Sequence, residues 1–145
     1  MYKGRINTDT TVVANTNIPF TTVFNTNSNT TPDGNNSDVR INKTGYYDIY
    51  ATIKYTDVVA SPVEVNILAD GNIVASATAD VTADTGIGTL TIIDVERVAV
   101  APFPDRATIA IQFDGAATIL TGSQEQFAHF HPMSPCFRAL RVTHI

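Results

Sequence analysis

Tyr46–Tyr55, with the sequence YYDIYATIKY, is the stretch of this chain with the most regular alternation. Tyr47, Ile49, Ala51, Ile53 and Tyr55 share one parity. Tyr46 and Tyr50 share the other parity with three polar residues. Such alternation over ten residues is typical of a β-strand with one face in a core. The stretch therefore predicts a long strand that carries two tyrosines on its outer face.

Shorter alternating runs follow along the chain, and none of them has a helical period. Asp70-Gly71 separates two such runs, which is the strongest short-range signal for a hairpin with a type I′ turn. Within Leu90–Val98, Ile93 and Val95 take the opposite parity from Leu90, and this change predicts a β-bulge. About eight to ten strands at this spacing indicate an all-β sandwich or barrel.

Two polar regions interrupt this pattern. Residues 1–37 are rich in Thr and Asn and predict an N-terminal arm with a polar loop from Asn25 to Ser37. This arm is a candidate docking segment, and the alternative is that part of it joins the sandwich. Residues 38–145 are the predicted sandwich domain. Gly122–Pro135 is predicted to be a polar and aromatic excursion.

Composition excludes several classes of protein. The 145 residues fit one domain, and a 43% hydrophobic content argues against disorder. The chain has no run of about 18 apolar residues, which a membrane-spanning helix requires. A single cysteine, Cys136, excludes a disulfide framework. The net charge of −5 argues against a nucleic-acid partner. We therefore expect a folded domain without a nucleic-acid or membrane partner.

Three stretches resemble a known family. They are Ile41–Ile49 (INKTGYYDI), Val63–Val74 (VEVNILADGNIV) and Phe137–Val142 (FRALRV). They are similar to the jelly roll of tumour necrosis factor and the complement-type globular head. The resemblance implies an antiparallel two-sheet jelly-roll sandwich and a homotrimer. The Asn- and Thr-rich chain looks more like the versions carried by tailed bacteriophages.

Aromatic residues are the candidate contacts. We assign Tyr46, Tyr50, Tyr55 and Phe137 to the trimer interface, because outer-face aromatic side chains tend to mark interfaces. The alternative is that each tyrosine shields its neighbours. The candidate partner-binding residues in exposed loops are Phe103, Phe127 and Phe130.

His129-Phe130-His131 is the candidate metal motif, because two histidines at positions i and i+2 of a strand point to one side. His144 is an available third ligand, and the alternative is a pair of exposed or interface imidazoles. Asp94 and Glu96 share one face of their strand near Arg97, and we expect solvated charges there. No nucleophile motif is present. We therefore expect no cofactor and no enzyme activity.

These features favour a non-enzymatic structural protein of a tailed-phage virion, acting as a trimeric capsid decoration or head-fibre module. The arm would bind the major capsid or fibre protein. One alternative is a receptor-binding head that recognises a host-surface glycan, and another is a metal-dependent jelly-roll enzyme. The first residues carry no apolar segment of the kind found in secretory signals. We therefore expect synthesis in the host cytoplasm and a final location in the virion.

Overall fold

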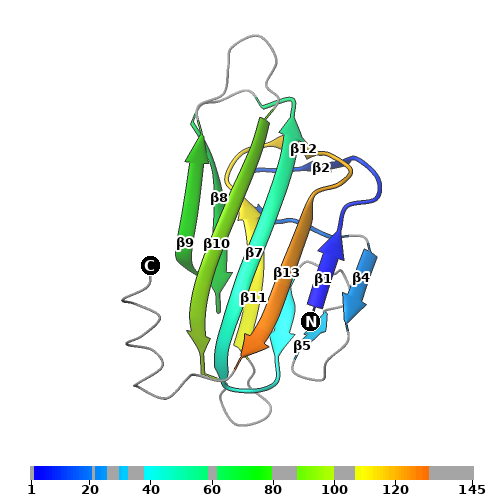
Figure 1. Ribbon diagram of the computed structural model, residues 1–145. Coiled ribbons are helices and arrows are strands. Elements are labelled where there is room, and N and C mark those ends of the chain that lie inside the picture. Colours follow the sequence, from blue (N-terminus) through cyan, green and yellow to red (C-terminus); the bar gives the residue numbers. More distant parts are fainter. Residues whose placement is uncertain are drawn as a thin grey trace, which may run out of the picture.

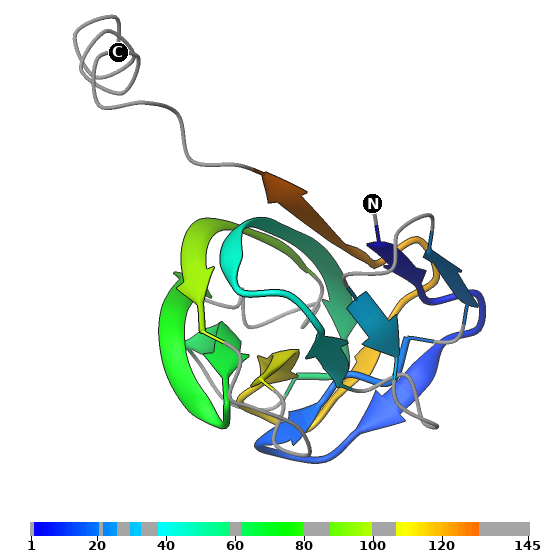
Figure 2. The ribbon, with the colours of Figure 1, turned by 90° about the horizontal axis from the view of Figure 1, so that it is seen from below.

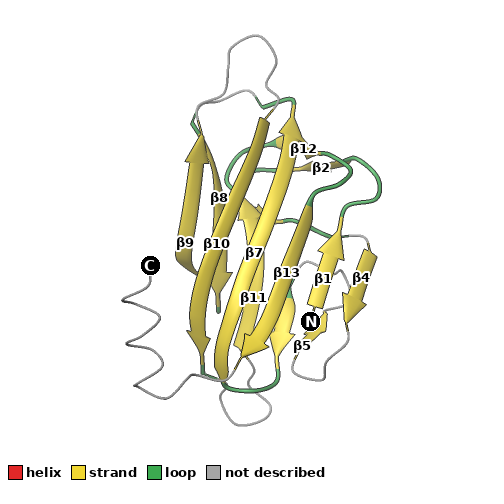
Figure 3. Cartoon of the chain, viewed as in Figure 1, coloured by secondary structure: helices red, strands yellow, loops and turns green. Residues whose placement is uncertain are grey.

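The computed structural model describes residues 2–20, 22–25, 30–32, 38–58, 62–79, 88–99 and 107–130. These residues form strands, turns and loops without any helix (Figure 3), which confirms the all-β prediction. No helix in the described part has the length and apolar character that a membrane crossing requires. The strands are β1 (Tyr2–Arg5), β2 (Thr10–Val12), β3 (Thr16–Asn17), β4 (Thr22–Asn25), β5 (Thr30–Pro32), β6 (Val39–Ile41), β7 (Gly45–Thr56), β8 (Val63–Ala69), β9 (Asn72–Ala79), β10 (Gly88–Val98), β11 (Ala107–Phe113), β12 (Ala117–Ile119) and β13 (Gln124–Phe130).

The strands form two antiparallel sheets, here called sheet A and sheet B (Figure 1). Sheet A has seven strands in the order β2-β12-β7-β13-β1-β4, and β10 pairs with the other side of β7. Sheet B has six strands in the order β5-β6-β11-β8-β9, and β3 also pairs with β11. Seen from the end in Figure 2, the two sheets enclose the space between them. The two-sheet architecture is therefore the predicted one.

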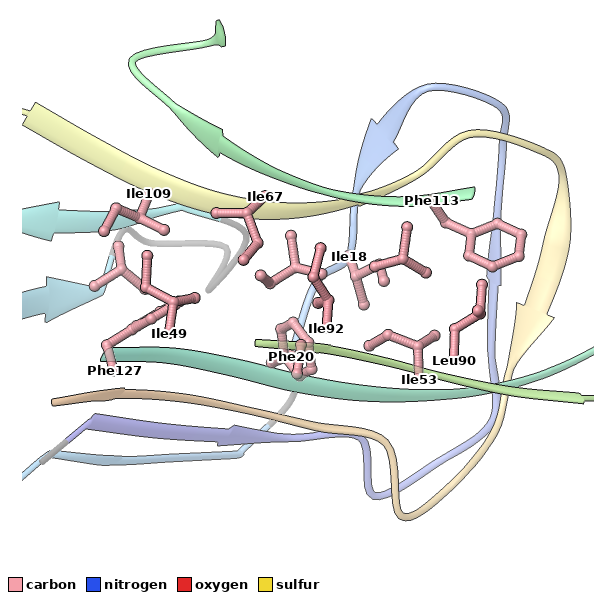
Figure 4. Close-up of a cluster of buried hydrophobic side chains, with 14 of the residues drawn as sticks. Ile18, Phe20, Ile49, Ile53, Ile67, Leu90, Ile92, Ile109, Phe113 and Phe127 are labelled. Atoms are coloured by element: carbon pink, nitrogen blue, oxygen red, sulfur yellow. The ribbon is translucent and has the colours of Figure 1, made fainter. Parts of the chain in front are cut away.

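The core lies between the inner faces of the two sheets. The strand alternation of β7 places Tyr47, Ile49 and Ile53 on the inner face, where none of them has exposed surface. Figure 4 shows Ile49 and Ile53 facing side chains of sheet B such as Ile67. Burying an aliphatic or aromatic side chain stabilises a fold by about 1.5–3 kcal/mol. The packed inner faces therefore hold the sheets together.

The Asp70-Gly71 hairpin is confirmed. Ala69 and Asn72 pair across the turn between β8 and β9. Asp70 has a φ of 51° and Gly71 has a φ of 81°. A type I′ turn requires positive φ at both central residues, which Asp and Gly tolerate. The Asp70 carboxylate also accepts a hydrogen bond from the Thr108 N–H at 2.9 Å and ties the turn to β11.

The bulge predicted in β10 is wrong. β10 pairs with β7 in one uninterrupted register, from Gly88 opposite Tyr55 to Val98 opposite Gly45. Ile93 and Val95 change parity because they are apolar side chains on the outer face of the sheet. A register shift does occur in sheet B, between Ile67 and Leu68 of β8 where it pairs with β9.

The described part of the N-terminal segment belongs to the sandwich, so the alternative that part of residues 1–37 joins it is confirmed, and the loose arm is wrong for these residues. β1 lies between β13 and β4 in sheet A. Ile6, Ile18 and Phe20 are at most 1% exposed and belong to the core. The predicted loop from Asn25 to Ser37 also contains β5, which pairs with β6. Strand pairing and buried apolar side chains next to the short strands thus anchor this segment.

The region predicted as an excursion after Gly122 forms β13, which lies between β7 and β1. The prediction is wrong for the described residues because Gln124–Ala128 alternates between a half-buried and a buried face. A glutamate, Glu125, occupies one of the buried positions. This charged residue interrupts the apolar alternation by which a strand is recognised in a sequence.

Gly88→Ala is expected to destabilise the fold. A Cβ atom at Gly88 would lie 2.5 Å from Cζ of the buried Tyr55. Overpacking of this kind lowers the free energy of unfolding by about 1–3 kcal/mol. Urea denaturation measures the loss, with Gly115→Ala as the control. A Cβ atom at Gly115 would meet only the Phe113 ring, at 4.0 Å. Equal losses in the two variants would contradict the steric explanation.

Candidate functional site

The outer face of sheet A carries apolar side chains on its two longest strands. Ile93 and Val95 of β10 are 72% and 51% exposed. Tyr46 and Tyr50 of β7 are half-buried on the same face, and Tyr50 lies opposite Ile93 in the ladder. We call Tyr46, Tyr50, Ile93 and Val95 the outer patch. β7 and β10 run side by side along this face (Figure 1).

Polar residues border the outer patch. Asp48 lies opposite Val95, and Arg97 lies opposite Tyr46. The Thr52 hydroxyl donates a hydrogen bond to the Tyr50 hydroxyl oxygen at 2.5 Å. Contiguous exposed apolar side chains with a polar rim mark interaction sites, and tyrosine is enriched in interface cores. The outer patch has these properties and is the candidate functional site.

Two predicted contact residues belong instead to the core. Tyr55 is 2% exposed on the inner face of β7, so its assignment to an interface is wrong. Phe127 is fully buried, so its assignment to an exposed loop is also wrong. Its ring stacks on the Tyr2 ring with a centroid distance of 5.3 Å. Both side chains lie on the inner faces of their strands, where a partner cannot contact them.

The remaining predicted residues are only partly placed. Phe130 and His129 lie in β13 and not in a loop. Phe103, Phe137 and His131 lie outside the described residues, as does His144. No group of three or more His, Cys, Asp or Glu side chains suited to a metal ion occurs among the described residues. The loop placement of Phe130 is therefore wrong, whereas the metal assignment of His129 and His131 and the assignments of Phe103 and Phe137 stay predictions.

Asp94 and Glu96 have a different environment from the expected one. They lie opposite Ile49 and Tyr47, whose side chains face the core, whereas Arg97 has the outward parity. Both residues are half-buried, and Asp94 Oδ2 is buried without a hydrogen-bond partner among the residues that the structure describes. Burial and the neighbouring Asp94 raise the pKa of Glu96. The expectation of solvated charges beside Arg97 is therefore wrong.

Glu125 is an unusual residue that the sequence reasoning missed. It lies on the inner face of β13, is 2% exposed and pairs with Gly4 of β1. A Cβ atom at Gly4 would come within 2.9 Å of Glu125 Oε1, so the carboxyl group packs directly on this glycine. Burial raises the pKa of Glu125 well above its usual value, and the negative Asp38 raises it further. The sequence did contain a signal for its burial, because Glu125 has the same strand parity as the apolar Phe127 and therefore lies on the same, inner face of β13.

Comparisons with known proteins identify the fold. No protein-family model and no curated protein matches the chain. The solved structure of murine APRIL is 14% identical over 89% of this chain and 98% of its own, with a TM-score of 0.70. The chain has the tumour necrosis factor-like jelly-roll fold. Eiger TNF from S. frugiperda matches at 12% identity, covering 92% of this chain and 94% of its own, with a TM-score of 0.66.

Rabbit GITRL is a third neighbour with this jelly roll. It is 14% identical over 76% of this chain and 82% of its own, with a TM-score of 0.53. Identities this low relate the folds alone, because one fold supports many functions. The family expected from the sequence motifs is therefore supported at the level of architecture.

Proposed function

We propose that this protein is a non-enzymatic structural and binding module that assembles as a homotrimer through the outer face of sheet A. The observation that carries the proposal is the exposure of Ile93 and Val95 beside Tyr50. Burial of these side chains against a second copy removes apolar surface from water, which favours association. The tumour necrosis factor-like jelly roll also implies a trimer.

A rotational trimer suits this surface for a geometric reason. The outer patch lies toward the β10 edge of sheet A, whereas Lys3 and Arg5 lie on β1 near the other edge. A ring with threefold symmetry brings two different surfaces of neighbouring copies together. The outer patch would therefore contact a different part of the next copy, and each copy would contribute both surfaces.

We also propose the virion of a tailed bacteriophage as the setting. A 16% content of charged residues and many Thr and Asn side chains suit close packing of many copies and adaptable hydrogen bonding. A capsid decoration or head-fibre module is the first form of this proposal, and a glycan-binding receptor head is the second. Because β1 and β4 belong to sheet A, docking to a capsid or fibre protein would use the folded domain.

The mass of the purified protein in solution tests the assembly. Light scattering after size exclusion should give about 47 kDa, the mass of three chains of 15.6 kDa. A single species of 15.6 kDa at micromolar concentration would contradict the homotrimer. Mass spectrometry of purified particles from the source culture tests the virion setting separately. Absence of the chain from the particles would contradict that setting.

A further inference from the structure

A cavity of about 310 Å³ opens at the end of the sandwich remote from the Asp70-Gly71 turn. Residues at the end of β7 and the start of β8 meet there with the loop between β2 and β3 and the loop between β11 and β12. Ala14, Val58, Pro62 and Ala116 supply apolar walls, and Asp114 supplies a carboxylate. Ligand pockets in proteins measure about 300–1,000 Å³, so this cavity has room for a small ligand.

Hydrogen bonds hold the loops around this cavity in place. The Asp114 carboxylate accepts a hydrogen bond from the Glu64 N–H at 3.0 Å, and the Asp114 N–H donates to the Glu64 carbonyl at 3.0 Å. The Gln112 side chain donates to the Asn15 carbonyl at 3.1 Å, next to Ala14. A site whose walls are already fixed loses less conformational entropy when a ligand binds.

The charges around the cavity have one sign. Asp114 lines it, and Asp57 and Glu64 adjoin the lining residues Val58 and Val63 in the chain. No lysine or arginine occurs in the neighbouring described residues 13–17, 57–58, 62–64 and 114–118. The hydrogen bond from the Glu64 N–H to Asp114 Oδ1 uses only part of the hydrogen-bonding capacity of a carboxylate, which has about four lone-pair sites. A positively charged hydrogen-bond donor in the cavity would bind the remaining lone pairs of the Asp114 carboxylate.

We propose that this cavity binds a small organic ammonium ion with a compact apolar body. The apolar walls would cover the body of the ligand, and the ammonium group would donate a charge-assisted hydrogen bond to Asp114. An anionic ligand would be repelled by the Asp114 carboxylate that lines the cavity. A neutral ligand of the same shape would keep the apolar contacts and lose the charged bond. The proposal does not depend on the homotrimer, because the cavity lies within one chain.

Titration with benzylamine, followed by two-dimensional amide NMR of the full chain, tests this site. Benzylamine should shift the Gly115 and Ala116 amide signals in a saturable way, while benzyl alcohol should bind about fivefold more weakly and benzoate should not bind. Asp114→Asn should weaken benzylamine binding about fivefold. The asparagine retains an oxygen that can accept from the Glu64 N–H, so the loop should keep its structure.

Two further variants locate the ligand. Asp70→Asn makes the same change at the opposite end of the sandwich, where the carboxylate also accepts a backbone N–H, and should leave binding unchanged. Gly115→Leu should block binding, because Gly115 lines the cavity and the nearest atom to its Cβ position, Cε1 of Phe113, is 4.0 Å away, which leaves room for a larger side chain. Equal binding of benzylamine and benzyl alcohol, unchanged binding to Asp114→Asn or to Gly115→Leu, or no saturable shift would overturn the proposal.

Discussion

Ile93→Glu is expected to convert a trimer of about 47 kDa into a folded monomer of 15.6 kDa. Ile93 is 72% exposed in the single chain, so a glutamate there remains in water and leaves the fold intact. In the trimer the same carboxylate would be buried without a partner, three times by symmetry. A loss of about 1.4 kcal/mol at one interface corresponds to a factor of about ten in its equilibrium constant.

Light scattering gives the mass of this variant, and urea denaturation shows that it is folded. Val13→Glu is the matched control, because Val13 is a β-branched residue with 64% exposure in the loop between β2 and β3. This control should remain a trimer. If Ile93→Glu stays at the mass of the unmodified protein, the outer patch is not the assembly surface, whatever the oligomeric state.

Glu125→Gln is expected to stabilise the protein at neutral and alkaline pH. The raised pKa of Glu125 means that the folded state holds its proton at pH values where the unfolded chain has lost it. Unfolding then releases a proton, so the free energy of unfolding falls as pH rises. The contribution of Glu125 is complete below the ordinary pKa of about 4.5 and is lost as the pH rises through the raised value.

A glutamine at this position does not titrate and keeps a neutral side chain in the core. At pH 8 the variant should exceed the unmodified protein in free energy of unfolding by about 1–3 kcal/mol, the size of a buried desolvation penalty. At pH 4 the two proteins should be similar. Asp38 lies near the side chain of position 125. Its carboxylate already accepts a hydrogen bond from the Asn17 side chain at 2.7 Å.

Urea denaturation between pH 4 and pH 8 measures this difference. Glu64→Gln supplies the control, since it makes the same change at a half-buried position on β8. Glu96 also has a raised pKa, and its contribution is common to all three proteins. Parallel pH profiles for Glu125→Gln and the unmodified protein would contradict the assignment of the proton to Glu125.

The strands and turns of the fold could be predicted where a single stretch of sequence carries a clear alternation of apolar and polar residues or a clear turn signal. β7 alternates over its whole length, and the Asp70-Gly71 turn requires only local backbone conformations that Asp and Gly adopt easily. The outward parity of Tyr46 and Tyr50 followed from the same alternation. The outer patch was only half predicted, because the parity of Ile93 and Val95 was interpreted as a bulge.

The errors concern contacts between residues far apart in the chain. β1 has only four residues, and its place in sheet A depends on pairing with β13, more than one hundred residues later. Phe127 was predicted to lie in an exposed loop because the neighbouring Glu125 hid the alternation of β13. A short strand is recognised through its partners, and a buried carboxyl group is tolerated only where the surrounding structure holds it in place.

The sequence by itself determined the strand class, the inner and outer faces of β7 and the turn between β8 and β9, because these depend on side-chain parity and local backbone conformation. Tertiary structure alone decided that the N-terminal residues complete sheet A, that Glu125 is buried beside Gly4 and that Ile93 and Val95 are exposed next to Tyr50. Each of these depends on which strands lie side by side. That choice is made by packing the whole core at once, and no single stretch of sequence contains it.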